Sequence, residues 1–324
     1  MALTTRFDCV SAADVDPLDI TAVSQLEVEN HSLAQDWGAT AFLSSWISTC
    51  ARIPGQPQVP ELAVVHDCLP ERSKMPPELA LQRRRWLLGA ARHLAVSAAT
   101  AQDLEGLLRR SPGSVPWCHS TASSVFSNSV QEPTAERLWA ALCKKAGLHS
   151  PFVLLPATSS IGSYKNPALV AQAMVDLPTL QLVLSGVGAG ARAKDLVSAY
   201  PALRNRCFGV GLTELELALA YRHALAVVLP SRVEGFGLPA VEATAAGGRL
   251  IVADSRGLRE AAAEAGMRVH PDQPGQLKSL LEMLLHPLMQ GWLDPLLAKR
   301  REQRLQRCCP DLLGLALLAC ARDL

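Results

Sequence analysis

The sequence predicts an α/β protein with two domains, and three observations support this prediction. The chain has 324 residues, roughly twice the length of an ordinary domain. Apolar residues form 49% of it and aromatic residues only 5%, which is ordinary for a protein of alternating strands and helices. From residue 151 onward, short apolar runs alternate with helical patterns of roughly 10–15 residues, which indicates a parallel sheet covered by helices on both faces.

The second domain is predicted over residues 149–305 as a doubly wound α/β domain. Helices are expected between its strands, and one of them begins at Pro239, because proline fits the first position of a helix. The expected strands are PFVLL (151–155), LQLVL (180–184), NRCFGV (205–210), ALAVVL (224–229), RLIVAD (249–254) and GMRVH (266–270).

The first domain, predicted over residues 1–148, carries weaker signals of the same kind. The first forty residues contain no clear apolar run bounded by turn residues, so no strand is predicted there. A last helix is expected over residues 306–324, packed back on the first domain. The segments with strand or helix signals are FLSSW (42–46), ELAVVHD (61–67), the helical LALQRRRWLLGAA (79–91), and RHLAVS (92–97).

Composition excludes several classes of protein. Lys and Arg (31) nearly balance Asp and Glu (30), so no nucleic-acid partner is expected. Nine cysteines without a C-x-x-C pair indicate reduced thiols and a cytoplasmic protein. The N-terminus has acids where a signal peptide needs a basic and then an apolar run, and the apolar stretch 312–321 is about half of a bilayer span. Secretion and membrane insertion are not expected, and no oligomeric state is predicted.

A basic run at residues 83–85, with Arg92 nearby, offers a second interpretation of the location. Such a run can contact anionic lipids or glycans, although it is more often a solvated helix face. A weak peripheral contact with a membrane surface is therefore the lesser alternative.

Polar residues follow most of the expected strands. Ligands of open α/β sheets lie beyond the carboxyl ends of the strands, so these residues are the candidates for a binding site. They are His66 and Asp67, Ser97, Ser159 to Lys165, Gly186 and Gly188, Gly209 to Thr213, and Ser231 to Glu234.

The stretch PSRVEGFGLPAVEATAAGG (230–248) suits a phosphate that is flanked by hydroxyl groups. Gly235 and Gly237 let backbone amides approach a ligand, and the N-terminus of the helix from Pro239 carries roughly half a positive charge. Glu234 and Glu242 would accept hydrogen bonds from hydroxyl groups on either side. The competing interpretation is that these acids only stabilise the helix dipole.

This stretch resembles the Glu-(seven residues)-Glu signature of the retaining GT-B glycosyltransferases, in particular family 4, the glycosyl transferases of group 1. The resemblance implies two Rossmann-like domains and the transfer of a hexose, with retained configuration, from a nucleotide-diphosphate sugar to a glycan, lipid or small-molecule acceptor. It implies no metal, and no cofactor besides the donor substrate. Other matches cover roughly residues 36–285 in family order: FLSSW, VVHDCLPE, AVSAATAQDL, SYKNPALVAQA, LQLVLSGVG, LTELELALAY and ADSRGLREAAAEAG.

The resemblance also implies roles for single residues. Lys165 matches the lysine that binds the leaving phosphate, Glu234 the acid that contacts the transferred hexose, and His66 the histidine beside the sugar; these three form the catalytic set. Glu242 matches the acid that binds the ribose hydroxyls. Ser97 matches a residue near the cleft, or is an N-cap only. The implied donor-binding residues are Ser159, Lys165, Gly186, Val210, Gly211, Leu212, Glu234, Phe236, Gly237, Leu238 and Glu242.

Two departures from the family matter. The apolar strand and glycine-rich loop with which its members usually start are not found, so either the gene start is internal or the N-terminal domain is reduced. Many relatives place an arginine six residues before the lysine, where this chain has Ser159. Both departures favour a second hypothesis, a degenerate GT-B protein that binds a nucleotide sugar or a partner without turnover.

Two further motifs are weak. Asp14-Val15-Asp16 matches the D-x-D of metal-dependent transferases, but no apolar strand precedes it. GVGAGA (186–191) fits a dinucleotide fingerprint, yet no acid ends the next strand to hold a ribose. An NAD-dependent dehydrogenase is therefore only a weak alternative.

Overall fold

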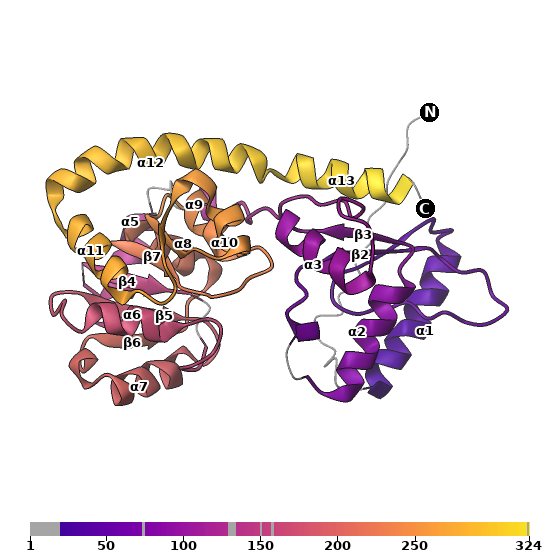
Figure 1. Ribbon diagram of the computed structural model, residues 1–324, viewed down its shortest axis with the longest axis horizontal. Coiled ribbons are helices and arrows are strands. Elements are labelled where there is room, and N and C mark those ends of the chain that lie inside the picture. Colours follow the sequence, from indigo (N-terminus) through magenta and orange to yellow (C-terminus); the bar gives the residue numbers. More distant parts are fainter. Residues whose placement is uncertain (1–19, 73–74, 129–133, 150, 157–158, 323) are drawn as a thin grey trace. The chain divides into compact units, whose positions relative to one another are not determined.

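The computed structural model describes residues 20–72, 75–128, 134–149, 151–156, 159–322 and 324 (Figure 1). The chain forms two compact units. The first contains the chain up to Cys118 together with Gly314–Leu324, and the second contains His119–Leu313. Each unit is an α/β structure, as the sequence predicts.

The first unit is built on a three-stranded parallel sheet in the order β1-β2-β3. Leu43 pairs with Leu62, and Ala63 pairs with His93. Its elements are α1 (Ile20–Asp36), β1 (Phe42–Ser44), β2 (Glu61–Val65), a 3-10 turn (Pro70–Arg72), α2 (Pro77–Gly89), β3 (Arg92–Ala95) and α3 (Ala98–Leu108).

The central strand β2 is buried on both faces. Ala63 and Val65 point to one face, where they pack with Trp86 of α2 and Leu104 of α3. Leu62 points to the other face and packs with Leu94 and with Cys320 of the last helix, α13 (Pro310–Arg322). The residues of α13 from Gly314 onward thus complete the core of this unit.

Helix α1 is an element that no sequence pattern indicated. It buries Val23, Leu26, Asn30 and Ala34, which recur at the three- and four-residue spacing of a helix face. Asn30 interrupts the apolar pattern because its Nδ2 donates to the carbonyl oxygen of Thr49 at 2.7 Å. A buried but hydrogen-bonded polar residue therefore hid the helical period.

The basic run of α2 is only partly exposed. Arg83 is 1% exposed, pairs with Glu71 and stacks over the Trp46 ring at 4.1 Å. Arg84 and Arg85 remain exposed. Arg83 therefore cannot take part in the surface contact that the run suggested. In the described part of the chain, no helix is long and apolar enough to cross a membrane.

The second unit is built on a six-stranded parallel sheet in the order β6-β5-β4-β7-β8-β9. This is the doubly wound order, which reverses between β4 and β7. The six predicted strands are confirmed, with ends shifted by one or two residues. They are β4 (Phe152–Leu155), β5 (Gln181–Ser185), β6 (Cys207–Val210), β7 (Ala226–Leu229), β8 (Leu250–Ala253) and β9 (Gly266–Val269).

Helices cover both faces of this sheet, which explains the continuous apolar runs of its strands. Val153 of β4 packs with α6 and α11, whereas Phe152 faces Trp139 of α5, with ring centroids 5.7 Å apart. The helices are α4 (Val125–Asn128), α5 (Ala135–Ala146), α6 (Pro167–Met174), α7 (Ala189–Ala199), α8 (Glu214–His223), α9 (Leu238–Ala245), α10 (Arg256–Ala262), α11 (Pro274–Leu285) and α12 (Pro287–Arg307), with 3-10 turns at Pro201–Leu203 and Ala263–Ala265.

The first and second units meet along the chain at residue 118, whereas the sequence pattern placed a domain boundary near residue 148. The difference is the segment that contains α5. Trp139 of α5 stacks on His223 of α8, with ring centroids 4.8 Å apart, and α5 packs on α8. These contacts group α5 with the second unit, although it precedes β4.

Helix α12 ties together the two helices that follow β7 and β8 (Figure 1). Arg301 donates to the carbonyl oxygens of Gly247 and Gly248, just beyond the end of α9, at 2.9 and 3.3 Å. Arg304 donates to the carbonyl oxygen of Ala261 in α10 at 2.8 Å. Guanidinium groups thus satisfy carbonyls that a helix end leaves unpaired.

Candidate functional site

The candidate site lies in the second unit, where the strand order reverses. Lys165 follows β4 and Glu234 follows β7, the two strands on either side of the reversal. Lys165 Nζ donates to Glu234 Oε1 at 2.7 Å, and the side chains are 25% and 15% exposed. The carboxyl ends of strands at such a reversal point form the usual ligand crevice of this architecture. The structure therefore brings together two of the three predicted catalytic residues.

A small hollow opens beside this ion pair. Among the lining residues Lys165 and Glu234 carry the charges, and most of the others are apolar or proline. The hollow is lined by Leu155, Pro156, Lys165, Pro167, Leu229, Pro230, Ser231, Glu234, Gly237, Pro239 and Leu258. A group bound there would meet one ammonium and one carboxylate against an otherwise weakly polar wall.

The N-terminus of α9 lies at this hollow. Gly237 is its N-cap, with φ 104°, and Pro239 stands in the first turn. Glycine is required at position 237, because that φ is strained for other residues and because a Cβ there would come within 2.6 Å of Leu258 Cδ2. The first backbone amides of a helix have no partner within the helix and favour an anion. Leu238 begins this turn after the N-cap Gly237, and Phe236 directly precedes the N-cap.

The loop before α9 lies directly on α10. A Cβ on Gly257 would overlap the carbonyl oxygen of Glu234 and lie 3.0 Å from the carbonyl carbon of Gly235. The lack of a side chain at position 257 thus lets α10 support the loop that carries Glu234. No role for Gly257 could be predicted from the sequence, because its partner Glu234 lies 23 positions earlier.

The side chain of Phe236 anchors the same loop. It is 4% exposed and stacks on His119, with ring centroids 5.1 Å apart and an interplanar angle of 14°. The guanidinium of Arg304 lies 5.7 Å from the Phe236 ring centroid. His119 Nε2 lies 2.9 Å from Glu260 Oε1. These contacts hold the Phe236 side chain in place between Glu234 and the start of α9.

Glu242 lies one turn into α9 and has a partner that the sequence did not reveal. Its Oε2 accepts a hydrogen bond from the hydroxyl of Tyr221 on α8 at 3.0 Å. Burial raises the pKa of Glu242, while the Tyr221 hydrogen bond lowers it and the charge of Glu214 raises it. Tyr221 is fully buried, and burial raises its pKa well above the usual value. Tyr221 therefore stabilises the charged form of Glu242.

The remaining predicted donor-binding residues lie after β4, β5 and β6. Ser159 lies in the loop between β4 and α6, and Gly186 directly follows β5 with φ 106°. Val210 ends β6, and Gly211 and Leu212 lead into α8. The structure thus places these residues at the same edge of the sheet as Lys165, Glu234 and Glu242.

Two local features fix the loops at this edge. Thr213 caps α8, since its Oγ1 accepts from the Glu216 amide at 3.2 Å and Glu216 in turn accepts from the Thr213 amide. A Cβ on Gly209 would overlap the backbone of Ala189, so glycine lets the start of α7 approach β6. The glycines of GVGAGA begin α7, and no acid ends β6.

The predicted residues of the first unit have clear local roles. His66 follows β2 and is exposed at the surface of the unit; desolvation by its neighbours lowers its pKa, while the charge of Asp67 raises it. Asp67 Oδ1 accepts from the Leu69 amide at 2.9 Å and so orients the following loop. Ser97 is the N-cap of α3, where its hydroxyl accepts from the Thr100 amide at 2.9 Å.

The arrangement of the metal-ligating side chains can be compared within the described ranges. No group of three or more His, Cys, Asp or Glu side chains there is placed to hold a metal ion. The Asp14-Val15-Asp16 motif lies outside the described residues.

Sequence comparison identifies a family over part of the chain. Residues 145–287 match the family described as glycosyl transferases group 1. The D-inositol 3-phosphate glycosyltransferase of Frankia alni is 32% identical over 157 residues, which are 44% of this chain and 39% of that protein. The chain therefore aligns with well under half of that curated relative.

Solved structures share the fold of most of the chain. A glycosyltransferase from Rickettsia africae has a TM-score of 0.70 at 15% identity, covering 96% of this chain and 83% of its own. Anabaena HepE in complex with UDP-glucose has a TM-score of 0.66 at 16% identity, covering 82% and 72%. The sucrose-phosphate synthase of Thermosynechococcus elongatus has a TM-score of 0.63 at 21% identity, covering 89% and 74%. These similarities establish the fold, which is the GT-B fold of two Rossmann-like domains.

Proposed function

We propose that this GT-B protein, whose residues 145–287 form a group 1 glycosyltransferase region, moves a hexose from a nucleotide-diphosphate sugar to an acceptor. The observation that carries the proposal is the Lys165–Glu234 pair at the reversal point of the sheet, beside the N-terminus of α9. A cation and a helix N-terminus suit a diphosphate, and carboxylates suit the hydroxyl groups of sugars. The complex of HepE with UDP-glucose supports a UDP-sugar as the first donor to test.

The leaving diphosphate would contact Lys165 and the amides of Phe236, Gly237 and Leu238. Negative charge grows on the diphosphate as its bond to the sugar breaks. A fixed ammonium and a fixed helix N-terminus stabilise that charge without rearranging at the moment of reaction. These groups would therefore contribute most in the transition state.

The two carboxylates would have different tasks. Glu242, held by Tyr221, would accept hydrogen bonds from the ribose hydroxyls. Glu234 would contact the transferred hexose, where positive charge builds at the anomeric carbon. For His66, a role beside the sugar is what the family resemblance implies.

We propose that the configuration at the anomeric carbon is retained and that no metal is needed. Both parts of the proposal rest on the family resemblance of the Glu234–Glu242 stretch. The resemblance leaves the acceptor as a glycan, a lipid or a small molecule.

The second candidate is a protein that binds a nucleotide sugar without turnover. The observation that favours it is charge: Lys165 is the single cation among the residues that line the hollow. Ser159, on the same loop as Lys165, adds no positive charge. With one cation to stabilise the charge on the diphosphate, a nucleotide sugar could bind while the bond between its sugar and its diphosphate breaks slowly.

The two candidates are separated by a donor assay. The full chain is incubated with UDP-, GDP-, ADP- and dTDP-sugars, with and without EDTA, and the released nucleoside diphosphate is measured. With water as the acceptor, we expect release from at least one donor, undiminished by EDTA, and a first NMR spectrum, recorded before the freed hexose mutarotates, that shows the donor's anomeric configuration. Tight binding of a nucleoside diphosphate with no release from any donor would support the non-catalytic candidate. Activity that EDTA abolishes and Mg²⁺ or Mn²⁺ restores would contradict metal independence.

A further inference from the structure

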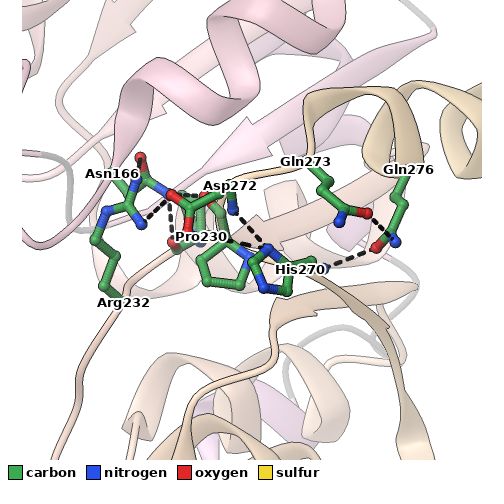
Figure 2. A network of polar contacts seen from close by, with 8 residues as sticks. Asn166, Pro230, Arg232, His270, Asp272, Gln273 and Gln276 are labelled. Atoms are coloured by element: carbon green, nitrogen blue, oxygen red, sulfur yellow. Dashed lines mark hydrogen bonds and ion pairs between the residues drawn. The ribbon is translucent and has the colours of Figure 1, made fainter.

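Asn166, the residue after Lys165, is nearly buried and makes two hydrogen bonds to other loops. Its side chain is 6% exposed. Nδ2 donates to the carbonyl oxygen of Pro230 at 3.2 Å and to that of Pro271 at 2.8 Å. Figure 2 shows its amide between these loops. Both hydrogens of the amide are therefore used, each on a different loop.

The backbone of Asn166 is as specific as its side chain. Asn166 is the N-cap of α6, with φ 54° and ψ 46°, and Pro167 begins the helix. This left-handed conformation is uncommon for residues other than glycine, asparagine and aspartate. Of these three, only asparagine also supplies the two donors that the carbonyls of Pro230 and Pro271 accept. Both the conformation and the hydrogen bonds thus select asparagine here.

Further contacts join the same loops. The Arg232 amide donates to the carbonyl oxygen of Tyr164 at 2.8 Å. The Arg232 guanidinium pairs with Asp272 and lies 3.5 Å from Asn166 Oδ1. Within the loop after β9, His270 Nδ1 accepts a hydrogen bond from the Asp272 amide at 3.2 Å (Figure 2). The loops after β4, β7 and β9 are therefore tied together, and Asn166, at the end of the first, contacts the other two.

The candidate ion pair stands on two of these tied loops. Lys165 directly precedes Asn166, and Glu234 lies two positions after Arg232. A lysine side chain is long and rotates easily, so its position depends on where its backbone is held. The 2.7 Å contact between Lys165 and Glu234 thus requires that the two loops keep a fixed separation.

We infer that Asn166 is a positioning residue for the diphosphate end of the donor site, an inference that rests on the proposed function. Its amide holds the loops after β7 and β9 against the start of α6, and this fixes the direction from which Lys165 approaches the phosphate. Asn166 itself has no role in contacting the donor. Its effect on binding therefore passes through Lys165.

The variant Asn166→Gly tests this inference, because glycine adopts the left-handed backbone and removes only the amide. Asn205→Gly is the matched control. Asn205 is also an asparagine with positive φ, 65°, but it is exposed and lies in the turn before β6. Calorimetry on the full chain measures the Kd of UDP, GDP, ADP and dTDP, and the tightest of them is used with both variants, with Lys165→Ala, and with Lys165→Ala combined with Asn166→Gly.

The expected result is a selective loss. Asn166→Gly should raise the Kd by about tenfold, whereas Asn205→Gly should leave it within about twofold. In the Lys165→Ala background, Asn166→Gly should add less than about twofold, because the group that it positions is gone. A variant that merely destabilises the fold would weaken binding equally in both backgrounds.

Three outcomes would overturn the inference. If Lys165→Ala weakens binding while Asn166→Gly binds like the unmodified chain, the inference fails and the proposed function stands. An equal effect of Asn166→Gly in both backgrounds would likewise show a structural role only. If the unmodified chain binds none of the four nucleotides, the proposed function fails, and the inference falls with it.

Discussion

At the scale of single residues, the site consists of charged groups whose neighbours decide how they act. Lys165 and Glu234 contact each other at 2.7 Å, so a bound phosphate and Glu234 would compete for one ammonium. Glu242 is held instead by a neutral hydroxyl, that of Tyr221. Glu242 can therefore accept hydrogen bonds from a ligand without first losing an ion pair.

The Tyr221–Glu242 contact predicts a pH effect. Removing the hydroxyl in Tyr221→Phe removes a contact that lowers the pKa of Glu242, so this pKa, already raised by burial, should rise further. As the pH falls below 7, Glu242 should become protonated at a higher pH in the variant than in the unmodified chain. The donor KM of the variant should therefore begin to rise at a higher pH. The measurement is donor KM between pH 5 and 8.

Stability gives a second readout of the same variant. The free energy of unfolding at pH 7 should fall by roughly 1–3 kcal/mol, because a buried carboxylate loses a donor. Tyr200→Phe is the control, since that hydroxyl meets Gln172 at an exposed position. A KM profile of Tyr221→Phe that coincides with that of Tyr200→Phe would refute the role of Tyr221.

Sequence position revealed the charged residues but not their supports. Lys165, Glu234 and Glu242 could be predicted because each stands at a fixed place after a strand or in the first turns of a helix. Tyr221, Gly257 and Asn166 could not, because their roles depend on partners distant in the sequence, such as Pro271, 105 positions after Asn166. Those partners become neighbours only when the sheet forms.

At the scale of elements, the strands were the most predictable part. Those of the second unit are apolar throughout because both faces of the sheet are covered, and they could be located to within one or two residues. Helix α1 was missed because hydrogen-bonded Asn30 interrupts its buried face. Strand order could not be predicted either, since it follows from packing between elements.

The contact between α10 and the Glu234 loop makes a prediction at this scale. Gly257→Ala places a Cβ where the backbone of Glu234 and Gly235 lies, so the loop must move. We expect donor kcat to fall about tenfold or more, with a lower melting temperature. The measurement is steady-state kinetics with the best donor, together with a thermal melt.

The control for this prediction is Gly291→Ala in the second turn of α12. A Cβ there meets nothing within 4 Å. That variant should keep its kinetics and gain up to about 1 kcal/mol in the free energy of unfolding, since alanine favours a helix more than glycine does. Unchanged kinetics in Gly257→Ala would show that α10 does not support the site.

At the scale of the whole molecule, the donor contacts that we propose lie in the second unit, His66 excepted. This unit has its own sheet and its own core. A fragment of residues 119–313 should therefore bind the preferred nucleoside diphosphate with a Kd within about tenfold of that of the full chain. Calorimetry on the fragment checks this, with circular dichroism as the control for folding. A folded fragment that binds no nucleotide, beside a full chain that does, would contradict the assignment.

The two-domain architecture could be predicted from the alternation of strands and helices. The residue at which the chain passes from one unit to the other was harder to predict. The segment with α5 precedes β4, yet Trp139 packs on His223 and Phe152 of the second unit. The place of α5 before β4 in the chain does not indicate the sheet against which it packs.

The central claim is that the carboxylates around the α9 N-terminus serve sugar transfer, and kinetics of two matched variants test it most directly. Glu234→Gln and Glu242→Gln each remove one charge and keep the side-chain shape. With the best donor, Glu234→Gln should lower kcat about tenfold to a hundredfold, the effect of losing about 1.4–3 kcal/mol from one charged hydrogen bond. Glu242→Gln should raise the donor KM more than it lowers kcat, because the ribose contact is equal in the ground and transition states. If both variants are folded and keep the kinetics of the unmodified chain, the two acids only stabilise a helix start, and the account is contradicted.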